Sequence, residues 1–491
     1  MTGIVEGFYG PPWSWADRLE VLRWSAARGL TDYVYAPKDD PKHRRDWRVL
    51  YDDTELAGFR SLVDDSGLRI GIAISPGLSM DETSQRDRAD LLDKLAPLLG
   101  LGVAHIGLFL DDPPPDPTRT AAQRGEAHAA LTTWLHEALG TGVLLSLVPT
   151  DYIGTRRSPY LDGLAGALPS DVSIGWTGAS VVNDEITADE ARARADAVGG
   201  RAPLLWDNVP VNDAVMSDRL FMGPLRGRSP ELRDLCSGYL ANPMVQPRAS
   251  MLPLASIAGW CAGADPTTAW ESAADALGWR AFAESCDGEL PQRLVAELIS
   301  EADGPAWTGP ADALHAWLVA AGGCEAPGLE VEAQPWIDQT RAEATLAMHA
   351  LSLFRHTRPA FEHLGSLRWR ATSPDADTVL ARSFGVATAW PHVRRAVPCV
   401  FGPRLAVRPA LRQTSTGAWA WRADAIEEDA NATDDLVRLA LDAAATIDPG
   451  APLVVYVDGR EVARQPDGSF EAAPECVVLA RRGNVLTRLR V

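Results

Sequence analysis

The chain has 491 residues, of which 46% are hydrophobic and 23% are charged, and its formal net charge is −20. This length predicts two or three domains, and the composition is typical of a soluble globular protein with a large buried core. The acidic balance argues against nucleic-acid binding, which needs a basic surface, and it disfavours a polyanionic substrate, which the chain would repel.

Cysteines, histidines and apolar runs give no sign of a metal, a cofactor or a membrane span. The six cysteines include no Cys-x-x-Cys or other metal-type spacing, and the nine histidines include no His-Glu-x-x-His pattern. No phosphate-binding loop is present. The first residues lack the basic and apolar regions of a signal peptide, and no apolar run is long enough to span a membrane. We therefore expect a cytoplasmic protein with reduced thiols, without cofactor or metal, and not bound to a membrane.

Eight short β-rich runs recur through the first half of the chain, with amphipathic helical patterns between them. Intervals of about 28 to 38 residues fit a (β/α)8 TIM barrel, which typically has about 250 residues. An open doubly wound sheet is the alternative, but no Gly-x-Gly-x-x-Gly turn follows the first run. We predict the barrel, over residues 1–265. Its strand-like runs span residues 3–8, 33–36, 69–74, 105–110, 143–148, 172–176, 203–206 and, less clearly, 238–241.

Beyond the barrel the pattern changes twice. Helical stretches predict a bundle over residues 266–369, and a mixed α/β region follows over residues 370–491. Two hairpins are expected in this last region, one through Asp458-Gly459 and one through Arg482-Gly483. It contains no catalytic motif, and its role is not readable. The helical stretches span residues 267–283, 290–302, 311–321 and 335–356.

Two acids directly follow one of the predicted strands. Six largely apolar residues, 105–110, stop at Asp111-Asp112, and the three prolines 113–115 forbid the strand to continue. Adjacent ionised carboxylates repel each other, so we expect one of them to keep its proton to higher pH. A neutral acid beside a charged base suits acid/base catalysis, whereas such a pair in isolation is more often a solvated turn or a helix cap.

Polar clusters also follow the other predicted strands. In a barrel these strand ends meet at the C-terminal face, where active sites form. The clusters are rich in aromatic, amide and carboxylate groups, which bind the apolar faces and the hydroxyls of sugars. Eight such clusters in register predict a carbohydrate site. They begin at Glu6, Pro37, Ser75, Asp111, Pro149, Trp176, Trp206 and Asn242.

Several of these segments carry a resemblance to a known family. They are Gly3-Ile-Val-Glu-Gly-Phe-Tyr-Gly-Pro-Pro-Trp13, Tyr35-Ala-Pro-Lys-Asp-Asp40, Leu110-Asp-Asp112, Trp206-Asp-Asn-Val-Pro-Val-Asn-Asp213 and Asn242-Pro-Met244. In this order they resemble family 84 glycoside hydrolases, which include protein O-GlcNAcases and bacterial β-N-acetylglucosaminidases often labelled hyaluronidases. The resemblance covers about residues 3–250 and, more loosely, continues to about residue 356. It implies a retaining exo-β-N-acetylglucosaminidase that removes terminal β-linked GlcNAc by substrate-assisted catalysis through an oxazoline.

The resemblance implies different roles for the two aspartates. Asp111 would orient and polarise the 2-acetamido group and stabilise the oxazoline. Asp112 would protonate the glycosidic oxygen and then deprotonate the incoming water. Their adjacency agrees with this chemistry, because a nucleophile from the protein would lie about 5 Å or more from the acid, across the sugar.

The same resemblance implies which residues shape the acetamide pocket. Tyr152 would donate a hydrogen bond to the acetamide oxygen, and Asn208 would support the acetamide and acid end. Trp206 and Val148 would surround the acetyl methyl group. By residue type alone, a tyrosine near a turn often packs locally, and a strand valine or tryptophan is more often core.

Four further residues are expected near the sugar hydroxyls. Asp213 would accept hydrogen bonds from O4 and O6, Asn242 and Lys38 would hold other hydroxyls, and the Gly7 carbonyl would lie nearby. A lysine is usually a solvated surface charge, but the place of Lys38 in its motif favours binding. The neighbouring acids are expected to brace loops or form barrel-end salt bridges; these are Asp39, Asp40 and Asp207.

The sequence departs from the family pattern at two places. Residues 113–115 are prolines where the family more often has an apolar residue and a short polar loop, and Val209 stands where many members have tyrosine.

Several alternatives for the function stay open. An endo-acting hyaluronidase is one alternative, and a non-catalytic GlcNAc-binding protein is another. The substrate could be a glycan or a glycosylated protein. A homodimer through the helical region is plausible by analogy alone.

Overall fold

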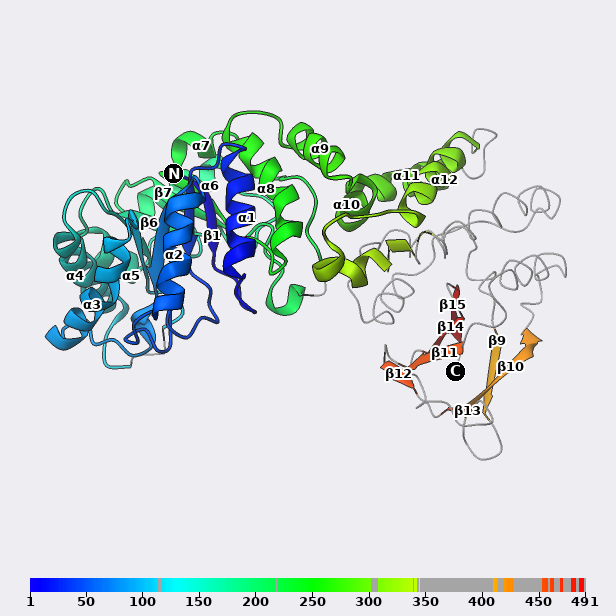
Figure 1. Cartoon of the computed structure of the whole chain (residues 1–491), viewed down its shortest axis with the longest axis horizontal. Helices are drawn as coiled ribbons and strands as arrows, with labels where there is room; N and C mark the ends of the chain where they lie inside the picture. The colour runs from blue at the N-terminus through cyan, green and yellow to red at the C-terminus, as the bar shows by residue number, and fades with distance from the viewer. Residues whose placement is uncertain are drawn as a thin grey trace. The chain divides into compact units, whose positions relative to one another are not determined.

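Figure 1 shows the computed structural model of the chain, which consists of two compact units. The first unit is Met1–Ser217 with Phe221–Ala276, and the second is Asp218–Leu220 with Leu277–Val491. The domain boundaries expected at residues 265 and 369 stay predictions. The structure describes residues 1–113, 117–217, 219–301, 308–338, 340–341 and 344, and a set of strands between residues 409 and 489.

The first unit is a closed barrel of eight parallel strands that pair in chain order, with β8 returning to β1. This confirms the predicted (β/α)8 fold, and each end of a predicted run differs from the strand by at most two residues. Nearly all strand residues are buried, as expected for parallel strands covered on both faces. The strands are β1 (Thr2–Glu6), β2 (Asp32–Tyr35), β3 (Arg69–Ile74), β4 (His105–Phe109), β5 (Leu144–Val148), β6 (Ser173–Trp176), β7 (Pro203–Asp207) and β8 (Gly238–Ala241).

Helices cover the outside of this barrel, as Figure 1 shows for α1, α2 and α8. Capping boxes fix where several of them begin, because a side-chain oxygen bonds the third helical N–H while that residue's side chain bonds back. Thr120 with Gln123 starts α4 in this way, and Asp52 with Glu55 starts α2. The helices are α1 (Trp15–Ala26), α2 (Asp53–Asp65), η1 (Pro76–Leu78), α3 (Gln85–Gly100), α4 (Ala121–Leu139), α5 (Pro159–Ala165), α6 (Ala188–Ala197), η2 (Ala214–Met216), α7 (Leu232–Leu235), α8 (Pro247–Cys261) and α9 (Pro266–Leu277).

Apolar side chains of the strands divide between two cores. The larger core lies between the strands and the helices, and the smaller one fills the inside of the barrel, because successive strand residues point to opposite faces. The inner core includes Phe109, Val148 and Trp206, each near the C-terminal end of its strand. The inside of the barrel is therefore closed by aromatic and branched side chains just below the strand ends.

The second unit contains helices and two antiparallel sheets. The stretch 267–283, predicted as one helix, is two helices, because Gly278 takes a positive φ of 72° and the first helix ends before it. The helices are α10 (Arg280–Asp287), α11 (Glu289–Glu301) and α12 (Thr308–Gly322). Residues 330–338 are helical as well, and most of the predicted helix 335–356 lies outside the described residues.

Both predicted hairpins are confirmed by antiparallel pairing, with Val457 opposite Arg460 and Arg482 opposite Val485. A second sheet, in the order β13-β10-β9, was not predicted. None of the described helices is both long and apolar enough to cross a membrane. The strands are β9 (Pro409–Gln413), β10 (Trp419–Ile426), β11 (Leu453–Val457), β12 (Arg460–Val462), β13 (Ser469–Phe470), β14 (Val478–Arg482) and β15 (Val485–Leu489).

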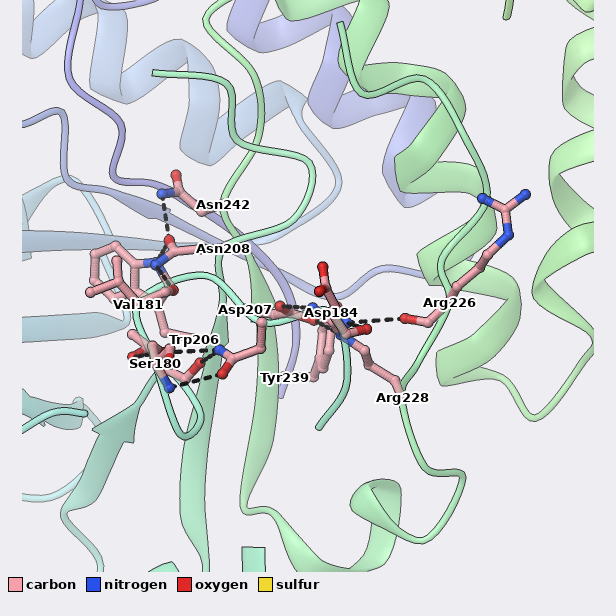
Figure 2. A network of polar contacts seen from close by, with 12 residues as sticks. Ser180, Val181, Asp184, Trp206, Asp207, Asn208, Arg226, Arg228, Tyr239 and Asn242 are labelled. Carbon is pink, nitrogen blue, oxygen red and sulfur yellow. Dashed lines mark hydrogen bonds and ion pairs between the residues drawn. The ribbon is translucent and has the colours of Figure 1, made fainter. Parts of the chain in front are cut away.

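A buried ion pair braces the barrel at the end of β7 (Figure 2). The Arg228 guanidinium donates from Nε and Nη2 to the two oxygens of Asp207, each at 2.8 Å, and the Tyr239 hydroxyl donates to the same carboxylate at 2.6 Å. Arg228 Nη1 also donates to the carbonyls of Asp184 and Arg226, each at 3.0 Å. This confirms the salt bridge expected of Asp207.

We predict that Asp207→Asn lowers the free energy of unfolding of the barrel by about 3–5 kcal/mol, because it leaves the Arg228 charge buried without its partner. Urea unfolding followed by tryptophan fluorescence measures the effect. The matched control is Asp189→Asn, whose side chain is 94% exposed and pairs with Arg192 on the surface of α6. Equal shifts in the two variants would contradict a structural role for the buried pair.

Candidate active site

Asp111 and Lys38 form a buried ion pair where β4 and β2 end. Lys38 Nζ bonds Asp111 Oδ2, and the two side chains are 5% and 7% exposed. Burial alone raises the pKa of Asp111, but the charge and hydrogen bond of Lys38 outweigh it and hold that pKa below its ordinary value. Asp111 is therefore ionised at neutral pH. Its other oxygen, Oδ1, is buried and has no hydrogen-bond partner among the described residues.

Lys38 determines the direction in which the pKa of Asp111 moves. The expectation that repulsion raises the pKa of one of the two acids stays a prediction, but that acid is not Asp111, whose pKa moves downward. The reason is that Lys38, which lies 73 residues earlier in the chain, supplies a closer opposite charge. The strand order of the barrel places it there, since β2 and β4 both flank β3.

Asp112 faces a different environment from its neighbour. It is exposed, and its φ of +47° places it in the left-handed region that residues other than glycine seldom adopt. The Tyr152 hydroxyl donates to Asp112 Oδ1 at 3.4 Å, and Arg44 Nη2 donates to the Asp112 carbonyl at 3.5 Å. Burial and the two aspartates raise the pKa of Tyr152, so its hydroxyl keeps its proton as a donor.

Two aromatic rings lie beside the ion pair of Lys38 and Asp111. The rings of Phe109 and Trp206 are 5.2 Å apart, and Lys38 Nζ lies 6.0 Å and 5.8 Å from their centroids. These distances allow the ring faces to stabilise the ammonium group. Val148 belongs to the same inner core as these two rings, and Tyr152 packs against that core. Val148 and Trp206 thus belong to the core and lie at the predicted site at the same time.

An amide network joins the ends of β7 and β8 (Figure 2) and extends to the residue after β1. Asn208 Oδ1 accepts hydrogen bonds from Trp206 Nε1 at 3.0 Å and from Asn242 Nδ2 at 2.9 Å, and Asn208 Nδ2 donates to the Val181 carbonyl at 2.7 Å. Asn242 Oδ1 accepts from Gly7 N–H at 3.1 Å. The approach is so close that a Cβ on Gly7 would lie 2.3 Å from Trp206 Cζ2. Asn208 and Asn242 therefore fix the position of the Trp206 ring.

Asp213 joins this group through the loop after β1. Its Oδ2 accepts the N–H of Tyr9 at 2.7 Å, and Asp39 Oδ2 accepts the N–H of Gly10 at 2.8 Å. Asp40 accepts the Tyr35 hydroxyl at 2.9 Å. The loop-bracing role expected of Asp39 and Asp40 is thus confirmed, and the ten predicted site residues all lie at strand ends or in the loops that follow them.

Sequence reasoning missed several residues of the loop that carries Lys38. His43 is fully buried, its Nδ1 lies 2.7 Å from the Ala73 carbonyl, and its ring meets Phe109 edge-on at 6.1 Å. Burial, followed by the charge of Lys38, lowers the pKa of His43 to about 3, so the ring is neutral. Arg44, next in the chain, contacts Asp112 as described above. Their place within six residues of Lys38 was the only signal in the sequence.

Neither a cavity nor a metal cluster identifies this site by itself. A cavity of about 480 Å³ lies in the loop between β5 and α5, and none of the ten predicted residues lines it. Three of its lining residues, Thr150, Asp151 and Ile153, are nevertheless the neighbours of Tyr152. Within the described part of the chain, no three His, Cys, Asp or Glu side chains gather as they would around a metal ion. The converging polar side chains define the candidate site.

The arrangement combines three chemical capacities. Asp111 offers a charged, desolvated acceptor oxygen at the barrel mouth, Asp112 offers an exposed carboxyl group, and Tyr152 offers a protonated hydroxyl beside Asp112. Such an arrangement can hold an N–H group and transfer a proton on one side of it.

The chain is similar in sequence to known proteins. The chain is 33% identical over 275 residues to the Protein O-GlcNAcase of Rattus norvegicus, and the match covers 53% of this chain and 30% of that protein. The Protein O-GlcNAcase of Mus musculus gives the same values. The chain therefore matches less than a third of the length of these relatives.

Solved structures show the same fold. A mutant of the Thermobaculum terrenum O-GlcNAc hydrolase has a TM-score of 0.68 and 27% identity, covering 82% of this chain and 94% of that one. The structure of CpGH84B has a TM-score of 0.65 and 22% identity, covering 73% and 70%, and supports the fold alone.

The family model described as beta-N-acetylglucosaminidase matches residues 2–287, which is more than half of the chain and includes all ten predicted site residues. The chain therefore belongs to the β-N-acetylglucosaminidase family, family 84 of the glycoside hydrolases.

Proposed function

We propose that this protein is a retaining exo-β-N-acetylglucosaminidase that removes terminal β-linked GlcNAc from glycoconjugates by substrate-assisted catalysis. The observation that carries the proposal is the unlike state of two adjacent carboxylates. Asp111 is buried and ionised, and among the described residues only its Oδ2 has a hydrogen-bond partner, whereas Asp112 is exposed beside a tyrosine hydroxyl. Membership of the family supports the reaction class.

Asp111 is assigned to the acetamide of the substrate. Its unpartnered Oδ1 accepts the acetamide N–H, and this bond turns the acetamide oxygen toward C1 of the sugar. As that oxygen attacks, the C1–oxygen bond to the leaving group breaks and positive charge develops on the forming oxazoline. A preorganised carboxylate stabilises such charge without reorganisation, because Lys38 already holds it in place.

Asp112 is assigned to the glycosidic oxygen. It donates its proton to the leaving group in the first step. In the second step it takes a proton from water, which attacks C1, opens the oxazoline and restores the acetamide with retained configuration. Tyr152 donates to the acetamide oxygen as it attacks, and its raised pKa keeps the hydroxyl protonated for this task.

The other residues are assigned to the sugar and its acetyl group. Trp206 and Val148 wall the acetyl methyl group, and Asn208 supports the acetamide and acid end while it holds the Trp206 indole. The residues assigned to the sugar hydroxyls are Asp213, at O4 and O6, with Asn242, Lys38 and the Gly7 carbonyl.

The adjacency of the two aspartates is the physical reason for a nucleophile from the substrate. In two-carboxylate retaining enzymes the acid and the nucleophile lie about 5 Å or more apart on opposite sides of the sugar. Asp111 is the neighbour of the acid in the chain and is already bound to Lys38, just beyond the ends of β4 and β2. Asp111 is therefore placed to bind the acetamide group of the substrate, and not to attack C1 from the opposite side of the sugar ring.

The biological setting is part of the proposal. The names of the relatives, Protein O-GlcNAcase and O-GlcNAc hydrolase, favour a glycosylated protein as substrate. We propose a cytoplasmic enzyme with a catalytic domain over residues 1–265, a helical domain over 266–369 that could carry a homodimer, and a third region over 370–491 whose role is open.

We predict that the two aspartates respond differently to the leaving group. Asp112→Ala lowers kcat/KM on substrates with poor leaving groups by about 10²–10⁴-fold but spares good ones, because general-acid assistance is lost. Asp111→Ala lowers kcat/KM on every substrate by about 10²-fold or more, because nucleophile activation precedes departure. Release of p-nitrophenol or phenol from the β-N-acetylglucosaminides measures both.

A thiazoline mimic of the oxazoline should inhibit the wild-type protein competitively. Undiminished activity of Asp112→Ala on poor leaving groups would sink its acid role, and insensitivity to the thiazoline would sink substrate assistance. A wild-type protein that binds the thiazoline without turnover would instead support a non-catalytic GlcNAc-binding protein.

We further predict that Lys38→Met moves the acidic limb of the kcat/KM–pH profile upward by about 1–3 units. Asp111 acts as the carboxylate, so activity is lost as pH falls through its pKa, which Lys38 holds down. Without Lys38, burial dominates and that pKa rises. Lys42→Met is the control, because Lys42 pairs with Glu55 at 2.6 Å. An unmoved limb in Lys38→Met would contradict the assignment of Asp111.

A further inference from the structure

We propose that Arg44 is a positioning residue for the general acid, and that Tyr9 connects it to the carboxylate of Asp213. The inference rests on the proposed function, because it concerns how Asp112 is held for its proton transfers. It adds a mechanical link between the group assigned to the sugar hydroxyls and the group that serves the leaving oxygen.

Arg44 bridges two oxygens on different loops. Its Nη1 donates to the Tyr9 hydroxyl at 3.1 Å, and its Nη2 donates to the Asp112 carbonyl at 3.5 Å. Burial opposes the charge of Arg44, but Tyr9 and the two aspartates outweigh burial and raise its pKa above the ordinary value. The guanidinium is thus charged and spans from the loop after β1 to Asp112, the third residue after β4.

Asp112 needs an external support of this kind. Its φ of +47° is a conformation that side chains with a Cβ rarely adopt, and the residue before a proline such as Pro113 favours extended backbone. The conformation persists only where the surroundings hold it. Arg44 holds the peptide carbonyl, while the Tyr152 hydroxyl bonds the carboxyl group at 3.4 Å.

The base of Arg44 is fixed to the barrel. The preceding residue, His43, bonds the Ala73 carbonyl through Nδ1 at 2.7 Å, and its own carbonyl accepts the N–H of Ser75 at 2.8 Å. Arg44 N–H also donates to the Pro41 carbonyl at 3.3 Å. The backbone of Arg44 is therefore anchored to β3. Its guanidinium can hold the loops that carry Tyr9 and Asp112 in place, because it does not move with them.

Tyr9 completes the link. Its N–H donates to Asp213 Oδ2 at 2.7 Å, and its hydroxyl accepts from Arg44. A sugar that engages Asp213 therefore acts on the same tyrosine whose ring end bonds the guanidinium beside Asp112. Binding energy from hydroxyls remote from C1 would in this way favour the productive position of the acid.

The test uses the full chain and a series of β-N-acetylglucosaminides from p-nitrophenyl, a good leaving group, to phenyl and alkyl, which are poor. Arg44→Ala is expected to lower kcat/KM on poor leaving groups by about 10–100-fold, a part of the general-acid contribution, and on p-nitrophenyl by less than about 3-fold. Arg44→Lys, which keeps the charge but can reach one oxygen, should recover part of the loss.

Tyr9→Phe tests the link with the loss of a single oxygen atom. It leaves the N–H bond to Asp213 intact and should show the same leaving-group dependence at smaller size. In Arg44→Ala/Tyr9→Phe the losses should not add, because both changes break one chain of contacts. Arg45→Ala is the matched control, since Arg45 is 74% exposed and pairs with the adjacent Asp46.

Equal losses on all leaving groups in Arg44→Ala, or additive losses in the double variant, would overturn the proposal. Circular dichroism and thermal melting identify a folding defect, and in that case Tyr9→Phe decides. If Asp112→Ala shows leaving-group dependence and Tyr9→Phe and Arg44→Ala do not, this inference fails and the proposed function stands. If Asp112→Ala shows none, the proposed function fails and takes this inference with it.

Discussion

Closure of the barrel is the constraint on which the rest of the first unit depends. The pairing of β1 with β8, Gly3 opposite Leu240, turns eight separate strand ends into one ring. Only then can Gly7 bond Asn242, which lies 235 residues further along the chain. The same ring brings Lys38 to Asp111 across one intervening strand. The barrel therefore assembles a polar site from segments that are far apart in the sequence.

Burial of charge is the second element that holds this ring. Glu6 with Arg18, Lys38 with Asp111 and Asp207 with Arg228 are all nearly excluded from water, and each pair joins two different segments of the barrel. An isolated charge at such depth would be costly, so each pair makes its two elements interdependent. Surface pairs such as Arg157 with Asp162 carry no such coupling, because water screens them.

The sequence predicted the barrel, and the candidate site residues that it named lie together at the strand ends, because strand periodicity and the residues that end each strand are local properties. The ends of the eight strands were placed within two residues, and the ion pair of Asp207 was expected in kind. Arg44 and His43 were missed, because their roles depend on side-chain direction. The downward pKa shift of Asp111 was missed because the partner that causes it is distant in sequence. The break at Gly278 needed a positive φ that composition alone does not reveal.

The missing side chain of Gly7 has a consequence for the shape of the site. The Trp206 ring occupies the space that a Cβ of residue 7 would fill, so the ring can take this position because residue 7 is glycine. Gly7 has no side chain, and it nevertheless determines the width of the barrel mouth through the position of the Trp206 ring. The size of the acyl group that the site accepts on the sugar nitrogen would therefore depend on Gly7 as much as on Trp206.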